Sequence, residues 1–157
     1  MNELQNKQYL SNFIIQLVKQ QTVLEPCSND DIEKIQSIVK PKELPGAYLE
    51  FMRTMGKYAS FLRGNDYSIN HIFDLRKGAE ELLEENNSDE RLTDDDFVFF
   101  MHQGYEFCFY KISEGDNPPV YFYSEEKCPF LSRGNNSKVF TKITDSLSEF
   151  FEGGFYR

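Results

Sequence analysis

The side chains best suited to acid–base chemistry near neutral pH are two histidines, His71 and His102. They lie in different segments, and neither belongs to an HxxH or HExxH spacing, so they do not indicate a zinc site. His102 is followed by Gln103 and Gly104, a pattern typical of a short hairpin turn. The histidines therefore favour turn and surface positions over a catalytic base or a metal ligand.

Three cysteines offer nucleophilic chemistry, and they are widely separated, at Cys27, Cys108 and Cys128. No CxxC spacing occurs, and an odd number of scattered cysteines is typical of reduced thiols rather than of a zinc ribbon. Cys108 lies between Phe107 and Phe109, which predicts a buried and unreactive thiol. Cys128 lies in a predicted loop, but no neighbouring residue marks it as an activated nucleophile.

Carboxylates are the most concentrated chemical group in the chain. Residues 79–96 contain nine acidic side chains against one basic side chain, Arg91, so this segment holds eight of the chain's nine net negative charges. Paired carboxylates can cleave glycosidic bonds, and the run Asp94–Asp96 could bind a divalent cation weakly. That run lacks the spaced ligands and central glycine of a calcium loop, and no phosphate-binding glycine motif occurs in the chain. We therefore expect no cofactor, no metal centre and no catalytic residue.

The acidic segment restricts the class of partner. A surface of one negative sign repels phosphate backbones and anionic lipids, so we expect neither a nucleic acid nor a membrane as partner. It favours a basic protein. The alternative is a solvated helix face and loop that keep the protein soluble, and the sequence leaves both interpretations open.

Five stretches carry the three- and four-residue apolar spacing of amphipathic helices, and several are flanked by capping or breaking residues. Leu75, Ala79, Leu82 and Leu83 form the apolar stripe of the fourth stretch, which leaves its glutamates facing outward. The predicted helices are residues 2–21, a helix from Ser28 or Asn29 to Pro41, a helix from Pro45 to Gly56, a helix from Asp74 to about residue 86, and a last helix capped by Thr144 or Asp145.

Strands are predicted mainly in an aromatic block, since residues 97–123 hold ten of the chain's 24 Phe and Tyr residues. Phe97–Met101 is apolar throughout and therefore predicts a central strand, while Tyr105–Ile112 predicts a neighbour with one partly polar face. Pro118 and Pro119 place the next strand at an edge or at a strand start. The other predictions are a turn over residues 64–66, a short extended segment over 67–72, a strand over 120–123 and a last strand over 139–143.

Helices, then strands, then a helix predict an α+β fold, with a mostly antiparallel, curved sheet of about four to six strands and helices packed beside it. The length suggests one domain over residues 1–157, with the helix at 2–21 as an extension. No apolar run is long enough to span a membrane, and the polar N-terminus lacks a signal pattern, so we expect a cytoplasmic protein.

Three segments in this order carry a family resemblance: LPGAYLEFMRTMG, then FVFFMHQGYEFCFYK with DNPPVYFY, then SLSEFFEGG. Together they resemble the SUKH superfamily of cell-wall-assembly regulators and bacterial immunity proteins, over roughly residues 31–153. The resemblance implies an α+β fold with a curved sheet, and it transfers no catalytic residue. The matching positions are Leu44, Pro45, Tyr48, Phe51, Gly56, Gly104, Pro119, Val120, Phe150 and Phe151.

The resemblance implies a non-catalytic immunity protein that neutralises a cognate polymorphic toxin, often a nuclease, by stoichiometric binding. The alternatives are a regulatory scaffold that binds a host protein and, with less support, a small hydrolase. We expect a monomer or a weak dimer whose partner is a basic protein toxin. The candidate contact residues, taken from the acidic segment and from tyrosines of the aromatic block, are Glu80, Glu81, Glu84, Glu85, Asp94, Asp95, Asp96, Tyr105, Tyr121 and Tyr123.

Overall fold

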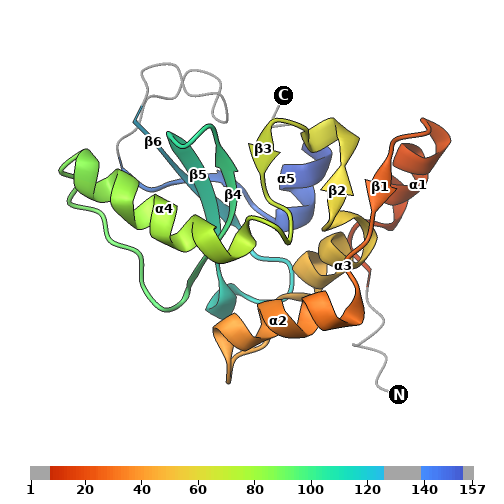
Figure 1. The fold of residues 1–157 in the computed structure, drawn as a ribbon, viewed down its shortest axis with the longest axis horizontal. Coiled ribbons are helices and arrows are strands. Elements are labelled where there is room, and N and C mark those ends of the chain that lie inside the picture. Colours follow the sequence, from red (N-terminus) through yellow and green to blue (C-terminus); the bar gives the residue numbers. More distant parts are fainter. Residues whose placement is uncertain (1–7, 126–138, 154–157) are drawn as a thin grey trace.

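The computed structural model describes residues 8–125 and 139–153. Over these residues the chain forms five α-helices beside an antiparallel sheet, with a small two-stranded ribbon at one end (Figure 1). The prediction of an α+β fold is therefore confirmed. The helices are α1 (Ser11–Lys19), α2 (Asn29–Val39), α3 (Gly46–Met55), α4 (Ile72–Glu85) and α5 (Leu147–Gly153).

The main sheet has five antiparallel strands in the order β3-β4-β5-β6-β7, within the predicted range of four to six. These strands are β3 (Asn65–Asp66), β4 (Asp96–His102), β5 (Glu106–Lys111), β6 (Val120–Ser124) and β7 (Thr141–Thr144). The separate ribbon joins β1 (Leu24–Glu25) to β2 (Tyr58–Ala59), two short strands that the sequence did not predict.

The predicted helix starts are right for α2 and wrong for α1 and α4. Ser28 caps α2 in a capping box with Asp31. Helix α1 begins at Ser11. The Glu50 carboxylate accepts hydrogen bonds from the amides of Tyr9 and Leu10, and these contacts keep the two residues outside the helix. Residues 1–7 lie outside the described part of the chain. Helix α4 begins at Ile72, before the predicted Asp74.

The segment between α3 and α4 also differs from the prediction. We expected a turn over residues 64–66, but Asn65 and Asp66 form β3, paired with His102 and Met101 of β4. Gly64 makes the turn just before the strand, with a φ of +92°. The extended segment predicted over 67–72 instead leads into α4, and the amide of Ile72 donates to the carbonyl of Ser68 at 2.9 Å.

The prediction of a partly polar face on β5 is not met at Glu106, because this first residue of the central strand is fully buried. Its carboxylate accepts a hydrogen bond from the Ser124 hydroxyl of β6. Strand β6 lies between β5 and β7, so Pro118 and Pro119 mark a strand start rather than an edge. The last helix is preceded by Ser146, whose hydroxyl accepts from the Glu149 amide in place of the predicted Thr144 or Asp145 cap.

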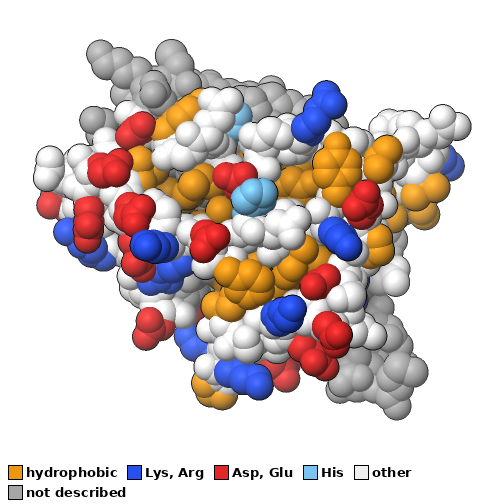
Figure 2. All heavy atoms as spheres, viewed as in Figure 1, with side chains coloured by type: hydrophobic (Ala, Val, Ile, Leu, Met, Phe, Trp, Pro, Cys, Tyr) orange, Lys and Arg blue, Asp and Glu red, His pale blue; other side chains and the backbone are white. Residues whose placement is uncertain are grey.

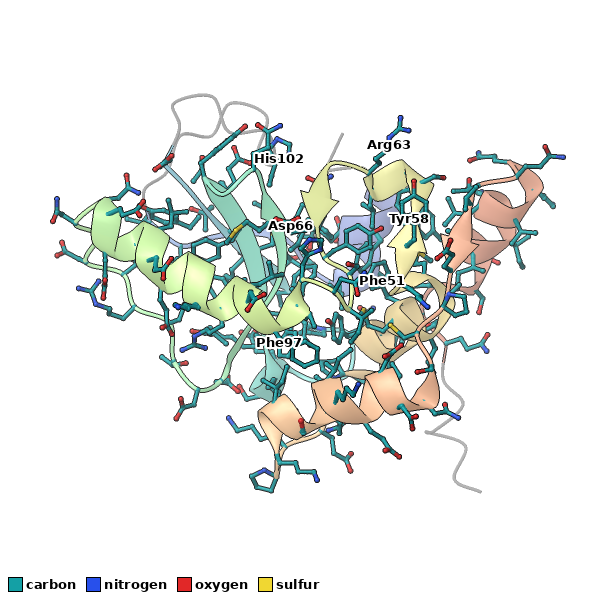
Figure 3. The ribbon with its side chains drawn as sticks, in the orientation of Figure 1. Phe51, Tyr58, Arg63, Asp66, Phe97 and His102 are labelled. Carbon is teal, nitrogen blue, oxygen red and sulfur yellow. The ribbon has the colours of Figure 1, made fainter. Side chains whose placement is uncertain are left out.

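The two faces of the sheet are covered by different helices. Phe99 and Phe100 both lie 5.4 Å, ring to ring, from Phe150 of α5, because a register shift in β4 turns two successive residues to one side. Met101 points the other way and meets Gly78 of α4. Phe51 and Phe97 point into the core between helices and sheet (Figure 3). The outer face of α4 is thereby left to solvent.

Candidate partner-binding surface along helix α4

The four candidate glutamates of α4 are all exposed, but they differ in charge environment. Glu80 pairs with Arg76 at 2.5 Å, and Glu81 lies 4.0 Å from Lys77, both one helical turn away. Glu84 and Glu85 have no cation within ion-pair distance among the described residues. The carboxylates of α4 without an ion pair among the described residues are therefore Asp74 in its first turn and the adjacent pair Glu84 and Glu85 at its C-terminal end.

The run Asp94–Asp96 divides into three different environments. Asp96 is 6% exposed, its carboxylate lies 2.7 Å from the Lys111 ammonium, and it accepts the Thr93 amide at 2.8 Å. It therefore stabilises the start of β4 and is not available as a surface contact. Asp94 is exposed, and among the described residues its carboxylate has no ion pair.

Asp95 is a partly buried bridge between two segments. Its carboxylate accepts two hydrogen bonds from Ser113, at 2.9 Å from the amide and 2.5 Å from the hydroxyl, and lies 3.7 Å from the Lys42 ammonium. Partial burial acts to raise the pKa of Asp95, but these hydrogen bonds and the charges of Lys42 and Lys111 outweigh it, so the pKa lies below its ordinary value. Asp95 thus has a structural role as well.

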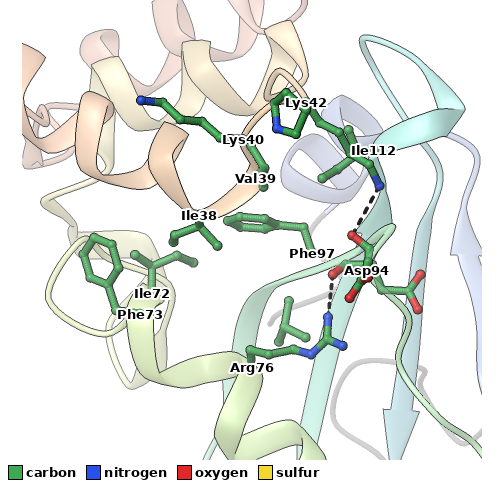
Figure 4. A pocket seen from close by; sticks show the side chains of 13 residues that line it. Ile38, Val39, Lys40, Lys42, Ile72, Phe73, Arg76, Asp94, Phe97 and Ile112 are labelled. Atoms are coloured by element: carbon green, nitrogen blue, oxygen red, sulfur yellow. Dashed lines mark hydrogen bonds between the residues drawn. The ribbon is translucent and has the colours of Figure 1, made fainter.

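Arg76 connects α4 to the acidic loop that follows it. Its guanidinium donates to the main-chain carbonyls of Thr93 and Asp96, both at 3.0 Å, while also pairing with Glu80. This places the loop before β4 beside the first half of α4 (Figure 4). The structure therefore brings together the acidic helix and the acidic loop.

The three candidate tyrosines do not form one groove. Tyr123 is fully buried and stacks on Phe107, so it is not a surface anchor, contrary to the prediction. Tyr121 is half-buried against Phe109, and its hydroxyl donates to Glu114 at 2.8 Å. Burial and that carboxylate raise the pKa of Tyr121 to about 12.

Tyr105 lies in the hairpin turn between β4 and β5, edge-on to His102 at 5.5 Å. Tyr105 is partly exposed, as Tyr121 is. It lies just before the first residue of β5, whereas Tyr121 of β6 pairs with Phe109 near the other end of β5. The partly exposed tyrosines are thus dispersed over the surface.

A groove that the sequence did not predict lies between the C-terminal end of α2 and the N-terminal end of α4 (Figure 4). It has a volume of about 490 Å³, and Phe97 and Val98 of β4 contribute to its lining. Ile38 of α2 is 48% exposed beside the groove. Phe73 follows the buried Ile72 by one position, which turns its side chain by about 100° around the helix axis and away from the apolar stripe of α4. This position outside the stripe could have predicted an exposed aromatic side chain.

The segments that carry the family resemblance meet at Asp116 and Asn117. The Asp116 carboxylate accepts the Gly46 amide at the start of α3, at 2.6 Å. The Asn117 side chain exchanges two hydrogen bonds with Ser148 of α5, at 2.9 and 3.0 Å. The loop before β6 therefore ties together the first turns of two helices that are about 100 residues apart in the chain.

The model of the SMI1 / KNR4 family (SUKH-1) matches residues 26–153. The chain belongs to this family. The match agrees with the resemblance over residues 31–153 and leaves α1 outside it. Neither a curated protein nor a solved structure gives a significant match to this SUKH-1 chain.

The two histidines of the SUKH-1 chain contact successive residues of β3, His102 at Asn65 and His71 at Asp66. Nδ1 of His102 lies 2.7 Å from the Asn65 side-chain oxygen, and burial lowers the pKa of His102 (Figure 3). His71 is exposed near Ser68 and Asp66. Within residues 8–125 and 139–153, no group of three or more His, Cys, Asp or Glu side chains is arranged to hold a metal ion.

The cysteines are poor nucleophiles where the structure describes them. Burial raises the pKa of Cys27 to about 11, and burial together with the nearby Glu106 also raises the pKa of Cys108 well above its ordinary value. Cys128 lies outside the described residues. In the described part of the chain, no helix has the length and apolar character needed to cross a bilayer.

Proposed function

We propose that this SUKH-1 protein is a non-catalytic immunity protein that neutralises a cognate protein toxin by stoichiometric binding. The observation that carries the proposal is the exposed, uncompensated carboxylate pair of Glu84 and Glu85 on a rigid helix. In the following loop Asp89, Glu90 and Asp94 also lack an ion pair among the described residues, and of these Asp94 lies at the other end of α4, beside Phe73 and Arg76.

This charge distribution suits a basic partner. A nuclease toxin must hold the phosphate backbone of its substrate in a cationic groove, and a cluster of protein carboxylates can occupy the same groove. Opposite charges also accelerate encounter between the two proteins and suppress association with wrong partners. An acidic helix end on an SUKH-1 domain therefore supports a toxin that acts on nucleic acid.

The contact set is narrower than the sequence indicated. Glu84 and Glu85 are its charged centre, Glu80 and Glu81 flank it with their charges partly compensated, and Asp94 lies apart from it, beside Phe73 and Arg76. Tyr105 and Tyr121 remain partly exposed candidates at the rim. Asp95, Asp96 and Tyr123 leave the set because their side chains are engaged or buried within the fold.

The non-catalytic part of the proposal is supported by the environment of the nucleophiles and bases. Cys27 and Cys108 are buried with raised pKa values, which leaves little of the reactive thiolate near neutral pH. A catalytic site requires a nucleophile and a base within hydrogen-bond reach of each other. A contact of this kind joins the Ser68 hydroxyl to Nδ1 of His71 at 3.2 Å, but it lies within the turn before α4, where the Ser68 carbonyl accepts the amides of His71 and Ile72, so it fits a structural role at the start of that helix.

The resemblance to a superfamily that includes cell-wall-assembly regulators also supports a second candidate, a regulatory scaffold that binds a host protein. The gene neighbourhood distinguishes the two candidates. An adjacent gene for a large toxin with a variable C-terminal domain supports an immunity function, and its absence supports the scaffold.

The test is binding to the C-terminal domain of the toxin encoded beside this gene, measured by calorimetry from about 50 to about 300 mM salt. The double variant Glu84→Lys/Glu85→Lys should bind at least about tenfold more weakly and show a smaller salt dependence. The matched control is Glu25→Lys/Glu33→Lys, which changes the net charge equally at two exposed acids outside α4. Equal affinity of both variants and the unaltered protein would remove the acidic helix end from the mechanism.

A further inference from the structure

The groove between α2 and α4 gathers apolar side chains that the fold does not cover. Six large apolar side chains are exposed among the described residues, and two of them, Ile38 and Phe73, line this groove at 48% and 46% exposure. They come from different helices. Figure 2 shows hydrophobic side chains gathered on the surface between α2 and α4. Single exposed apolar residues are ordinary, but two at one opening favour a contact site.

The polar groups along the groove are mostly engaged already. The Lys42 ammonium lies 3.5 Å from the Asp94 carbonyl and 3.7 Å from Asp95, and the Arg76 guanidinium binds two carbonyls and Glu80. Asp96 is paired with Lys111. A polar small molecule would find few convergent free groups, which such ligands need for specificity.

One cation beside the groove remains uncompensated. Lys40, at the end of α2, is exposed and has no ion pair among the described residues. The groove therefore offers open apolar surface next to one free ammonium group on its α2 side, while the unpaired carboxylate of Asp94 lies on the side formed by the loop before β4 (Figure 4). Its chemical complement is a large apolar side chain with a carboxylate close to it.

The groove and the acidic helix end belong to one surface. Glu84 follows Phe73 by eleven positions, which is about three turns, so the two side chains leave α4 in nearly the same direction, about 16 Å apart. The paired residues Arg76–Glu80 and Lys77–Glu81 lie between them. A distance of this size fits within one protein–protein interface of standard area.

We propose that the groove receives a segment of the protein partner that carries a large apolar side chain beside a carboxylate. The apolar side chain lies between Ile38 and Phe73, and the carboxylate pairs with Lys40. This inference rests on the proposed function, since basic residues of the same partner meet Glu84 and Glu85. An apolar anchor in a groove supplies affinity, and the pairing of Lys40 with a carboxylate and of Glu84 and Glu85 with basic residues fixes the orientation of the partner.

The first experiment measures binding of the adjacent toxin's C-terminal domain to two matched variants. Ile38→Asp alters the groove, while Ile15→Asp makes the same change on α1 at a nearly equal exposure of 51%. Ile38→Asp should weaken binding at least about tenfold, and Ile15→Asp should leave it unchanged. Lys40→Glu, which alters only an exposed side chain, should weaken it several-fold.

The second experiment needs no toxin. N-acetylphenylalanine, an aromatic side chain beside a carboxylate, is titrated at millimolar concentration while amide chemical shifts are recorded. Shifts should be confined to residues around Ile38 and Phe73, should weaken with Lys40→Glu, and should be smaller with uncharged N-acetylphenylalanine amide. No shifts at the groove, or the same shifts in the Lys40→Glu variant, would overturn the inference.

The two experiments separate failure of the inference from failure of the proposed function. If Glu84→Lys/Glu85→Lys weakens toxin binding but Ile38→Asp and Ile15→Asp bind the toxin domain with the same affinity, the proposed function stands and the groove proposal is overturned. Where the unaltered protein does not bind the toxin domain, the proposed function fails and the N-acetylphenylalanine titration alone decides the groove. Binding of that probe without any effect of Ile38→Asp on toxin binding indicates a small-molecule site and also overturns the proposal.

Discussion

The main-chain amide of Gly46 donates a hydrogen bond of 2.6 Å to the carboxylate of Asp116, 70 residues later in the chain. The same carboxylate accepts the Tyr9 hydroxyl at 2.8 Å, and the Asp116 carbonyl accepts the Ala47 amide. A negative charge here compensates the free amides and the positive dipole end of α3. This contact explains chemically why Leu44-Pro45-Gly46 and the segment from Asp116 to Pro119 occur together.

Gly46→Ala should destabilise the fold by about 1–3 kcal/mol, because the added Cβ would lie 2.4 Å from Asp116 Oδ2 and displace the capping carboxylate. The control is Gly78→Ala in α4, where the new methyl meets the flexible Met101 side chain at 3.4 Å. That change should be neutral or stabilising by up to about 1 kcal/mol, since alanine favours a helix interior. Thermal or urea unfolding measures the stability of both variants. If Gly46→Ala is as stable as the unaltered protein, the Asp116 carboxylate does not stabilise the start of α3.

The run Asp94–Asp96 should respond unequally to neutralisation. Asp96→Asn leaves the partly buried Lys111 without its partner at 2.7 Å and should cost about 3 kcal/mol. Asp94→Asn alters an exposed side chain and should change stability by less than about 0.5 kcal/mol. Urea unfolding at neutral pH measures both values. Similar costs for the two variants would contradict the burial of Asp96.

The stability contributed by Asp95 should depend on pH in a defined direction. The pKa of Asp95 is lowered in the folded protein from an ordinary value of 3.8, so the folded state favours the charged form. Its contribution is fully present above about pH 4 and is lost as the pH falls through the lower, folded pKa. Asp95→Asn should therefore be less stable than the unaltered protein at pH 7, by about 1 kcal/mol, and the difference should shrink below about pH 3.8. A stability difference between the two proteins that persists or grows in acid would contradict a lowered pKa of Asp95 in the folded state.

The hydroxyl groups of two buried tyrosines should contribute differently to the stability of the fold. The Tyr67 hydroxyl contacts the amide and carbonyl of Ala59 at 2.6 and 3.2 Å, so Tyr67→Phe should cost about 1–2 kcal/mol. The Tyr48 hydroxyl is buried and has no hydrogen-bond partner among the described residues, so Tyr48→Phe should be neutral or stabilising. Melting temperatures of the two variants test this, and a larger loss for Tyr48→Phe would contradict the packing described around α3.

Local signals predicted those parts of the fold in which neighbouring residues determine the conformation. The capping box of Ser28 and Asp31, the turn at Gly104 with its φ of +80°, and the alternation of helices and strands were all readable in the chain. The extent of α1 was not, because it depends on Glu50, 40 residues away. Helix boundaries that are determined by tertiary contacts leave no local pattern.

The candidate surface was predicted only in part for the same reason. Charge counting along the chain found the acidic segment but could not show that Asp96 is buried against Lys111 or that Arg76 compensates Glu80. Alternation within a strand does not reveal which face is covered, so Tyr123 was assigned to the surface although it is buried. The groove is formed by α2 and α4 together, and neither helix alone indicates it.

The most direct test of the central claim is a titration of toxin activity with this protein at concentrations well above the dissociation constant. Binding predicts a linear loss of toxin activity that ends at one equivalent and does not deepen with incubation time, and full activity should return when the complex is dissociated. Inactivation of many toxin molecules by each copy of this protein, increasing with time, would show turnover and contradict the account.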